Sequence, residues 1–385
     1  MIPYGRQDIN GEDIEAVVRV LRSDYLTQGP EIEGFEKETS LFCGAPHAIA
    51  VNSATSALHM ACAALGVGQG DLVWTSPNSF TASANCARYC GADVGFVDIG
   101  DDLNMDPSDL AARLTRARAA GRLPKVVIPV DFAGRSCRMG EIRALAEEYG
   151  FAIVEDASHA IGGTLGGAPV GGHGLADITV FSFHPVKIIT SGEGGMAVTH
   201  NAELAQRMRL FRTHGITRDP AQMTSEPDGP WYYQQIELGF NYRITDLQAA
   251  LGRSQLRRIN AFVERRREVR YAYDTALSKS DLGLPPPDEG CRSALHLYPV
   301  RVPACLAGGR DAVFARLREA GLGVNVHYIP IHTQPYYQAL GFRWGDFPKS
   351  ESYYREAISL PMYAAITPEQ LGTVIETVLT AVAPR

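Results

Sequence analysis

A single lysine, Lys187, lies between an apolar stretch and a glycine-rich segment in the sequence FSFHPVKIITSGEGG, residues 181–195. A lysine at the end of a strand, in a site that lowers its pKa, can form an imine with a carbonyl compound. The glycines allow the backbone to approach a ligand closely, because they carry no Cβ. The alternative is a lysine whose charged end simply reaches solvent.

A second group of polar residues follows an apolar run in the sequence VEDASHAIGG. Asp156 closes the expected strand, and His159 follows three residues later. A partly buried aspartate stays ionised where a cation faces it, and a protonated ring nitrogen of a ligand would serve. Alternatively, Asp156 caps the turn after the strand.

The sequence NSATSAL places small hydroxylated residues at the start of an alanine-rich segment. Backbone N–H groups at a helix start, with the hydroxyls of Thr55 and Ser56 beside them, favour a bound phosphate. An ordinary serine or threonine cap has the same sequence pattern. Together with Asp156 and Lys187, this segment predicts three contact points for one phosphorylated ring cofactor.

The elements that must position these residues alternate between strands and helices. The expected strands lie within residues 47–51, 71–77, 92–99, 125–132 and 151–158, and the expected helices within 53–65, 81–91, 106–121 and 139–150. Such alternation predicts an α/β fold with a mostly parallel sheet covered on both faces. Ligands bind at the carboxyl ends of such strands, so residues 54–56, 156–159 and 182–187 are expected to converge there.

The remaining segments suggest a second, smaller unit. Residues 12–21 and a segment ending at Gly44 have helical patterns, and residues 216–237 are polar, contain three prolines and predict a long loop. One long amphipathic helix is expected over residues 245–277, followed by a small α/β domain. We therefore expect a large cofactor-binding domain over residues 1–250 and a small domain over residues 251–385.

The composition excludes several classes of partner. Of the 385 residues, 45% are hydrophobic and 21% are charged, which is typical of a folded protein. A formal net charge of -7 offers no basic surface for nucleic acid, and two arginine-rich segments suit the solvated faces of helices. No apolar run approaches a membrane span and no signal-like segment is evident, so we expect a cytoplasmic protein without a membrane partner.

The seven cysteines are scattered and lack the spacing of metal ligands or of a C-x-x-C motif. We expect no metal site, and we expect reduced, mostly buried thiols.

The order of the motifs resembles that of the DegT family of sugar aminotransferases. The matching segments are NSATSAL, EDASHAIG, FSFHPVKIITSGEGG, LFRTHG and GFNYRITDLQAALG. The resemblance extends from DYLTQGP to ISLP and covers nearly the whole chain. It implies the fold-type I architecture, in which helices flank a mixed, mostly parallel sheet and a small C-terminal α/β domain follows, with pyridoxal 5'-phosphate as cofactor.

Carried over residue by residue, the resemblance assigns roles around the cofactor ring. Lys187 would form the imine with the cofactor and later carry a proton. Asp156 would pair with the protonated pyridine nitrogen and keep the ring an electron sink. His159, where the family often has glutamine, would contact the ring hydroxyl. Phe80 would stack on the ring, unless it is an ordinary core aromatic.

The resemblance also assigns the phosphate and substrate contacts. The residues expected at the phosphate are Ala54, Thr55 and Ser182, with Asn241 reaching the phosphate of a neighbouring subunit, which implies a homodimer with shared active sites. The residues expected at the sugar nucleotide are Tyr4, His327, Tyr328, His332 and Arg243. The alternatives are buried structural histidines for His327 and His332, and an ion pair within the subunit for Arg243.

The implied reaction is a ping-pong transamination. L-glutamate would give its nitrogen, leave as 2-oxoglutarate, and a nucleotide-linked 4-keto-6-deoxy sugar, such as an N-acetylamino sugar, would accept the nitrogen at C4. The segments NSATSAL, FSFH, HLYP and VHYIPI are similar to those of the family branch that makes pseudaminic acid, a surface-glycan sugar. The alternatives are a different keto-sugar configuration, amination at C3, or a non-catalytic pyridoxal phosphate-binding regulator on the same fold. A dehydratase, which has histidine at the lysine position, is disfavoured by Lys187.

Overall fold

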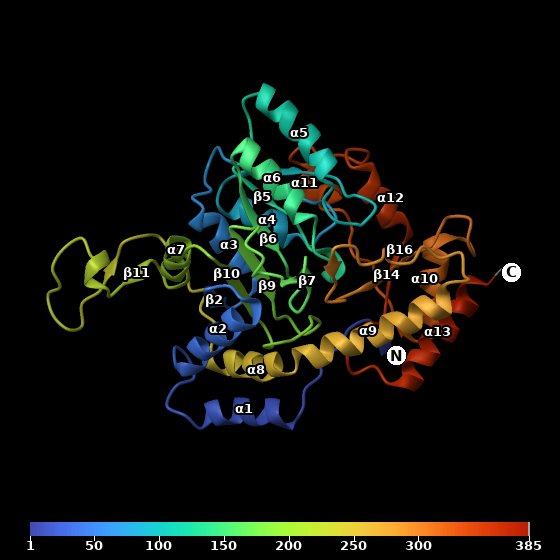
Figure 1. Cartoon of the computed structure of the whole chain (residues 1–385), viewed down its shortest axis with the longest axis horizontal. Helices are drawn as coiled ribbons and strands as arrows, with labels where there is room; N and C mark the ends of the chain where they lie inside the picture. The colour runs from blue at the N-terminus through green and yellow to red at the C-terminus, as the bar shows by residue number, and fades with distance from the viewer. Residues whose placement is uncertain (384–385) are drawn as a thin grey trace.

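The computed structural model describes residues 1–383 of the chain (Figure 1). The helices are α1 (Gly11–Leu21), α2 (Pro30–Cys43), α3 (Ala54–Ala64), α4 (Ala82–Tyr89), α5 (Pro107–Ala119), η1 (Phe132–Gly134), α6 (Met139–Tyr149), α7 (Ala202–Arg212), η2 (Pro220–Gln222), α8 (Asp246–Arg257), α9 (Ile259–Leu277), α10 (Gly309–Glu319), η3 (Ile331–Thr333), α11 (Pro335–Gln338), α12 (Pro348–Glu356) and α13 (Pro368–Val382).

The strands are β1 (Ile2–Pro3), β2 (His47–Val51), β3 (Leu72–Thr75), β4 (Asp93–Phe96), β5 (Val126–Ile128), β6 (Ala152–Asp156), β7 (Thr164–Leu165), β8 (Ala168–Pro169), β9 (Ile178–Ser182), β10 (Gly195–Thr199), β11 (Ile216–Thr217), β12 (Gln234–Gln235), β13 (Cys291–Arg292), β14 (Tyr298–Arg301), β15 (Leu322–Gly323) and β16 (Ala357–Leu360). The predicted strands and helices of the first 158 residues are confirmed.

A seven-stranded sheet forms the centre of the molecule, in the order β2-β10-β9-β6-β5-β3-β4. The pairs β9-β6, β6-β5, β5-β3 and β3-β4 are parallel, whereas β10 runs antiparallel to both of its neighbours. The sheet is therefore mixed and mostly parallel, as expected from the sequence. Because β10 returns between β2 and β9, it brings the start of α3 next to the end of β9.

Successive side chains of each strand point to opposite faces, so a two-residue alternation separates the two layers of the core. Val180 packs with α3, α4 and α7, whereas the adjacent Phe181 packs with α2 and the α8–α9 region. Helices α5 and α6 extend this second layer over β5 and β6. The sheet is covered on both faces, which explains why its strands are apolar throughout rather than alternating with polar residues.

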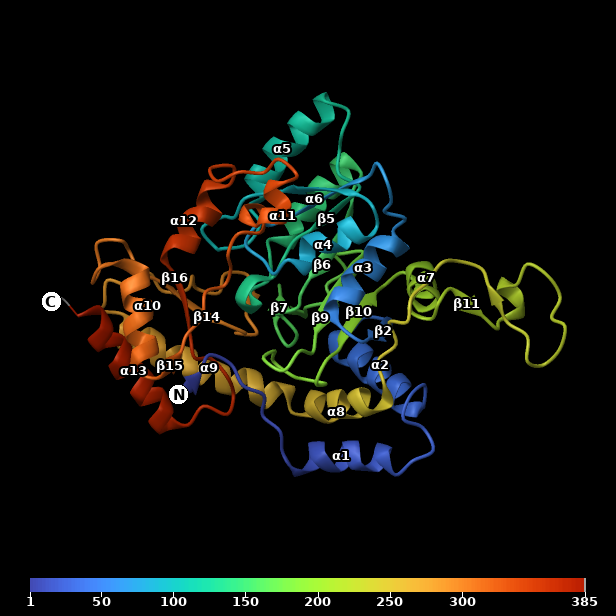
Figure 2. The same cartoon turned by 180° about the vertical axis from the view of Figure 1, so that it is seen from behind.

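A second apolar cluster forms the C-terminal part of the molecule around the antiparallel pair β14-β16, with α10, α13 and the C-terminal half of α9. Strand β1 pairs with β15, through Ile2 opposite Leu322, so the amino-terminal strand lies in this C-terminal part rather than on the central sheet (Figures 1 and 2). The division at residue 250 stays a prediction.

The expected continuous helix over residues 245–277 is wrong, because the structure contains two helices separated at Arg258. The backbone of Arg258 leaves the helical conformation, with φ -101° and ψ 0°. Its guanidinium also donates hydrogen bonds to Asp8 and Asp13, which ties the break to the amino-terminal segment. Helical periodicity continues through this point in the sequence, so the break leaves no signal in the apolar pattern.

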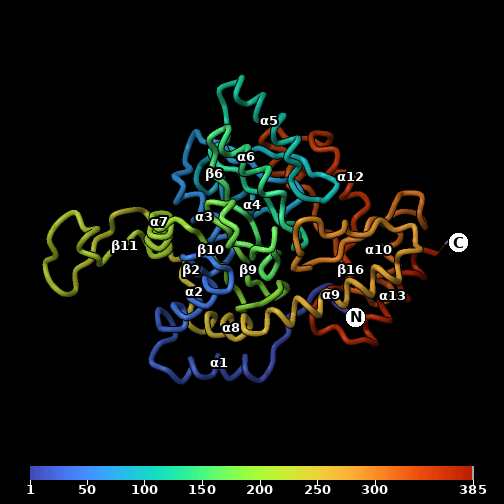
Figure 3. The backbone as a smooth tube through the Cα atoms, in the orientation of Figure 1, coloured from blue at the N-terminus to red at the C-terminus, as the bar shows by residue number. Residues whose placement is uncertain are grey.

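The polar segment expected as a loop is a narrow hairpin that projects from the body of the molecule beyond α7 (Figure 3). Its two strands pair through Ile216 opposite Gln235 and Thr217 opposite Gln234. Trp231 and Leu238 are 72% and 75% exposed, although both are large and apolar. We call residues 216–238 the arm. Among residues 1–383, no helix combines the length and apolar character that a membrane crossing requires.

Helix α2 receives its cap from a distant residue. Its N-cap, Gly29, has no side chain, and Asp246 at the start of α8 accepts hydrogen bonds from the amides of Gly29 (2.6 Å) and Glu31 (2.9 Å). Asp246 is fully buried. One carboxylate therefore joins α2 to α8 and neutralises the unpaired amides of a helix start.

We expect Asp246→Ala to lower the free energy of unfolding by about 2 kcal/mol, because two buried amides lose a charged acceptor. Urea denaturation followed by circular dichroism measures this change. Asp24→Ala, at an exposed aspartate in the turn before α2, is the matched control and should leave the midpoint unchanged. Equal midpoints for both variants would contradict the capping role.

Candidate active site

A cavity of about 960 Å³ lies where the segments after β2, β6 and β9 converge with the segment 325–328. The predicted residues that line it are Tyr4, Ala54, Thr55, Phe80, Asp156, His159, Ser182, Lys187, His327 and Tyr328. The structure thus brings together the three segments that the sequence pattern placed at neighbouring strand ends. A volume of this size accommodates a cofactor and a further ligand.

The start of α3 presents two amides to the cavity. Ser53 is the N-cap, and its hydroxyl accepts from the Ser56 amide at 3.1 Å, while the Ser56 hydroxyl donates to Asn52 at 2.7 Å. Within residues 1–383, the amides of Ala54 and Thr55 meet no acceptor. The cap and the anion site are therefore compatible, because the cap occupies the third amide and leaves the first two to a ligand.

Gly195 lets strand β10 pass next to this helix start. A Cβ at position 195 would lie 2.5 Å from the carbonyl carbon of Ser53 and 2.6 Å from the nitrogen of Ala54. The sequence suggested that the glycines of SGEGG make room for a ligand beside the lysine. At Gly195 the room is instead taken by the backbone of the amide pair, so this glycine shapes the site through protein–protein contact.

Asp156 is held at the end of β6 by two serine hydroxyls. The Ser83 hydroxyl donates to Oδ2 at 2.6 Å, and the Ser158 hydroxyl and amide donate to Oδ1. The carboxylate is 4% exposed and faces the cavity. A buried carboxylate with neutral donors and no paired arginine or lysine is suited to binding a ligand cation such as a pyridinium N–H.

Lys187 follows β9 in a turn in which its amide donates to the carbonyl of His184 at 2.9 Å. Part of the side chain faces the cavity, and no carboxylate of residues 1–383 lies within ion-pair distance of its Nζ. Burial lowers the pKa of Lys187 to about 8, while the charge of Asp156 acts in the opposite direction. A substantial fraction of the amine is therefore neutral and nucleophilic near pH 8.

His159 lies between Lys187 and the C-terminal segment. Its Nδ1 accepts from the Ala133 amide at 3.3 Å, so the neutral ring carries its proton at Nε2, which lies 3.1 Å from the Tyr328 hydroxyl. Burial, followed by the charge of Lys187, holds the pKa of His159 well below its usual range. His159 is a neutral donor at Nε2.

The C-terminal part supplies one wall of the cavity. His327 Nδ1 lies 2.8 Å from the Ser359 hydroxyl, and the rings of His327 and Tyr4 are 5.3 Å apart. Burial and the charge of Lys187 lower the pKa of His327 to about 3, so this ring is neutral. Phe80 is 60% exposed at the rim, 6.5 Å from the Tyr328 ring.

Three predicted residues lie outside the cavity. His332 is fully buried, bonds Glu351 through Nε2 at 3.0 Å, and packs on Phe347. The expected substrate contact of His332 is not supported, because its side chain is enclosed in a core cluster. Arg243 pairs through its backbone with Val51, and Asn241 is exposed beside Asn52 at the base of the arm.

Several lining residues were missed by sequence reasoning. Ser83 and Ser158 hold Asp156, and His296 contacts His159 with ring centroids 4.2 Å apart and the ring planes tilted by 46°. Ser158 lies within EDASHAIG and His296 lies within HLYP. Both are polar residues inside segments that already indicated the site, and this was the only sign of their role in the sequence. Ser83 lies on α4, in a helix whose pattern carries no such signal.

These residues fit pyridoxal 5'-phosphate on structural grounds. Two amides without acceptors at a helix start match a phosphate, a buried carboxylate matches a pyridinium nitrogen, and an amine of lowered pKa matches an aldehyde. No group of histidine, cysteine or acidic side chains among residues 1–383 is arranged to bind a metal ion. Four of the seven cysteines are buried, and none of the seven is in a disulfide.

Comparison with known proteins supports the same assignment. Residues 7–379 match the model of the DegT/DnrJ/EryC1/StrS aminotransferase family. The spore coat polysaccharide biosynthesis protein SpsC of Bacillus subtilis is 40% identical over 98% of this chain and 96% of its own. The UDP-4-amino-4,6-dideoxy-N-acetyl-beta-L-altrosamine transaminase of Campylobacter jejuni (strain 81-176) is 37% identical over 94% of this chain and 93% of its own.

Solved structures have the same fold. PseC of Helicobacter pylori, an aminotransferase involved in the biosynthesis of pseudoaminic acid, superposes with a TM-score of 0.91 at 31% identity, covering 99% of both chains. The sugar aminotransferase Spr1654 of Streptococcus pneumoniae in its PLP form gives a TM-score of 0.89 at 31% identity, covering 99% of this chain and 98% of its own. The fold-type I architecture is confirmed.

We expect the amine of Lys187 in the cofactor-free protein to react with small aldehydes at a rate that rises with pH, with a midpoint near 8. The lowered pKa makes the neutral amine available above that pH, whereas an exposed lysine needs a pH above 10. Reductive methylation with formaldehyde, followed by peptide mass spectrometry, gives the midpoint at Lys187 and at an exposed lysine as control. Asp156→Asn should lower the midpoint further, because it removes the charge that raises this pKa. Equal midpoints for Lys187 and the exposed lysine would contradict the assignment.

Proposed function

The chain belongs to the DegT/DnrJ/EryC1/StrS aminotransferase family, and on that basis we propose that it transfers an amino group from L-glutamate to C4 of a nucleotide-linked 4-keto-6-deoxy sugar. The single observation that carries the catalytic part is the convergence of the Ala54 and Thr55 amides, Asp156 and Lys187 on one cavity. The proposed substrate class rests on the transaminase relative, whose named product class is a UDP-linked 4-amino-4,6-dideoxy sugar.

Pyridoxal 5'-phosphate supplies the electron sink that makes an amino acid Cα–H acidic. The amides of Ala54 and Thr55 would bind its phosphate, with Ser182 beside them. Asp156 would hold the proton on the pyridine nitrogen, since its carboxylate is fixed by Ser83 and Ser158 and keeps one direction open to the cavity. These contacts fix the position of the ring relative to Lys187.

Lys187 would act as the proton carrier at Nζ. A base is most effective when its pKa lies near the working pH, and a pKa of about 8 meets that condition. His159 would orient the ring through its Nε2–H, which is a donor because the Ala133 amide occupies Nδ1. At about pH 8 both the neutral and the protonated forms of the Lys187 amine are present, so Nζ can accept and release a proton.

The sugar nucleotide would enter along the wall made by Tyr4, His327 and Tyr328. These side chains line the same cavity as the expected cofactor contacts and offer hydroxyl and imidazole groups. Neutral hydrogen-bonding groups suit the hydroxyl and amide substituents of a sugar. The stereochemistry at C4 would follow from this wall, because small differences in such contacts decide between isomers.

We further propose a homodimer in which the arm and the turn that carries Asn241 reach the partner's site. The arm projects from the body and bears exposed Trp231 and Leu238, which a lone subunit would leave in water. Asn241 is exposed at the base of the arm, next to Asn52 at the rim of its own phosphate site. A two-fold contact there would place each Asn241 near the phosphate site of the other subunit.

The alternatives are amination at C3 or of another sugar configuration, and a non-catalytic pyridoxal phosphate-binding regulator. The pathway is proposed as the synthesis of pseudaminic acid or a related surface glycan, in line with the relatives named for pseudoaminic acid and spore coat polysaccharide. A panel of nucleotide keto-sugars with glutamate, followed by product identification, separates the sugar alternatives.

We expect the protein loaded with pyridoxal 5'-phosphate to be converted by L-glutamate to the pyridoxamine 5'-phosphate form, with release of 2-oxoglutarate. Absorbance and chromatography of the cofactor measure this conversion. Lys187→Arg should slow it by at least about a hundredfold, because the arginine keeps the charge but cannot carry the proton. A cofactor-loaded protein that glutamate leaves unchanged would favour the regulatory alternative.

Shared active sites predict complementation between two inactive variants. In a mixture of Lys187→Ala and Asn241→Ala chains, a mixed dimer has one site that carries both defects and one that carries neither. After unfolding and refolding together, about a quarter of all sites should recover activity. The same variants mixed without exchange are the control, and their activity should stay at the background level. Absence of recovery in dimers shown to be mixed by mass spectrometry would refute the shared site.

A further inference from the structure

Arg266, on helix α9, is a fully buried arginine that faces carbonyl groups rather than a carboxylate. Its side chain is 1% exposed, and one terminal nitrogen donates to the carbonyls of Leu295 (3.1 Å), His296 (3.3 Å) and Met362 (2.9 Å). Among residues 1–383, no acidic group forms an ion pair with Arg266, and its Nε has no acceptor. A buried charge of this kind is costly, which calls for a role beyond packing.

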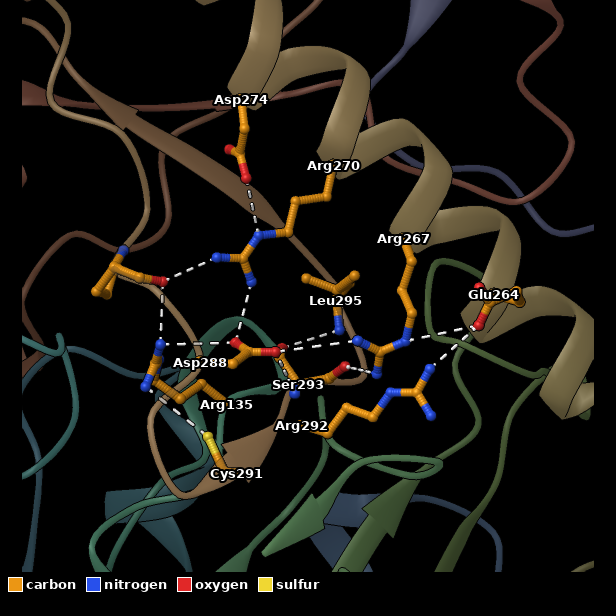
Figure 4. A network of polar contacts seen from close by, with 11 residues as sticks. Arg135, Glu264, Arg267, Arg270, Asp274, Asp288, Cys291, Arg292, Ser293 and Leu295 are labelled. Atoms are coloured by element: carbon orange, nitrogen blue, oxygen red, sulfur yellow. Dashed lines mark hydrogen bonds and ion pairs between the residues drawn. The ribbon is translucent and has the colours of Figure 1, made fainter. Parts of the chain in front are cut away.

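Two of the three carbonyls that Arg266 binds, those of Leu295 and His296, belong to the segment that carries His296. The amides on the other edge of the same segment donate to the turn of η1: Ala294 to the carbonyl of Gly134 and His296 to that of Ala133, each at 2.9 Å. Residues 294–296, which we call the clamped segment, are therefore held between α9 and the η1 turn. Figure 4 shows that the stretch just before it is held in the same way, by arginines of α9 and by Arg135 around Asp288.

The η1 turn fixes the ring of His159 through its Nδ1 atom. Ala133 adopts a left-handed conformation with φ 58°, which is unfavourable for a residue with a Cβ and persists where the surroundings impose it. In this conformation its amide donates to His159 Nδ1 and its carbonyl accepts from His296. Gly134 follows with φ 95°, and a Cβ there would lie 2.8 Å from the His159 carbonyl oxygen. The turn has little space to move.

We propose that Arg266 is a positioning residue that clamps the His296 segment against the Ala133 turn and thereby keeps the Nε2–H of His159 directed into the active-site cavity. The chain of contacts is continuous: Arg266 to the His296 backbone, the His296 backbone to Ala133, and Ala133 to His159 Nδ1. The His296 ring, tilted against the His159 ring, adds side-chain contact along the same path. This inference rests on the proposed role of His159 at the cofactor.

An arginine suits this task better than a neutral donor for two reasons. Its long side chain places one charged terminal nitrogen within hydrogen-bond distance of three carbonyls of two separate segments. Its charge also opposes protonation of His296. Burial is the main reason why the pKa of His296 is well below its usual range, and the positive charges of Lys187 and Arg266 act in the same direction.

The test uses the protonation site of His159 in the cofactor-free protein, which does not depend on activity. Long-range proton–nitrogen NMR spectra of histidine-labelled protein distinguish the Nδ1–H, Nε2–H and charged rings, and His159→Asn identifies the signals. The wild-type protein should show His159 as the Nε2–H form at pH 7. An Nδ1–H or charged His159 in the wild type would overturn the proposal without any variant of Arg266.

Arg266→Lys is the main variant, because a lysine keeps the charge but is shorter and does not place its nitrogen where the terminal guanidinium nitrogen lies. We expect shifted His159 and His296 signals, a mixture of His159 forms, and a half reaction with glutamate at least about tenfold slower. Arg266→Gln, which keeps a donor without the charge, should shift the signals further.

Arg265→Met is the matched control. Arg265 is the neighbouring residue on α9, donates to Glu268 and to the Ile366 carbonyl, and has no contact with the clamped segment. This variant should leave the His159 signals unchanged, whatever its effect on the melting temperature. Folded Arg266 variants with wild-type His159 signals, or equal shifts in Arg265→Met, would overturn the proposal. If the wild type is active and the Arg266 variants have unshifted His159 signals, the clamp alone is rejected. If the wild type is inactive and the Arg266 variants have shifted His159 signals, the proposed function alone is rejected.

Discussion

Lys187 has an amine whose pKa is lowered by burial and which forms no ion pair with a carboxylate in the described part of the chain. The arrangement of the surrounding residues depends on keeping this amine unpaired. A buried ammonium that had an ion-pair partner would stay charged and could not attack a carbonyl. The site therefore keeps its acid, Asp156, on serine hydroxyls at the end of a neighbouring strand, where it still raises the pKa of the lysine but does not pair with it. The imidazoles of His159 and His327 remain neutral because burial, and then the charge of Lys187, lowers their pKa values.

The position of Lys187 depends on three strands of the central sheet: the parallel pair β6 and β9, and the antiparallel β10 between β9 and β2. The parallel strands β6 and β9 bring Asp156 and Lys187 to one edge of the sheet. The antiparallel β10 then runs between β9 and β2, where Gly195 permits contact with the start of α3. The amides at the start of α3, the carboxylate of Asp156 and the amine of Lys187 therefore occupy fixed positions relative to the sheet. The C-terminal part completes the cavity from the other side.

The parts of this arrangement that depend on local patterns were predictable from the sequence. Apolar runs that alternate with helical segments located the strand ends, and the ends carried the chemistry at Ala54, Asp156 and Lys187. What depends on distant contacts was not predictable. The break at Arg258 is tied to Asp8 and Asp13, and the enclosure of His332 arises from packing on Phe347. The support from Ser83 and His296 likewise appears only once α4 brings Ser83 to Asp156 and the clamped segment bonds to the η1 turn.

The pairing of β1 with β15 links the completion of the cavity to the order of synthesis. Tyr4 follows β1 directly, and β1 has its partner only at Leu322 and Gly323, some three hundred residues later in the chain. On the ribosome, the sheet and its helices can form as soon as their own residues emerge, because domains fold largely in the order in which they are made. The wall that carries Tyr4 must wait until nearly the whole chain is available. The nascent protein therefore acquires Lys187, Asp156 and the amides of Ala54 and Thr55 well before the face that carries Tyr4.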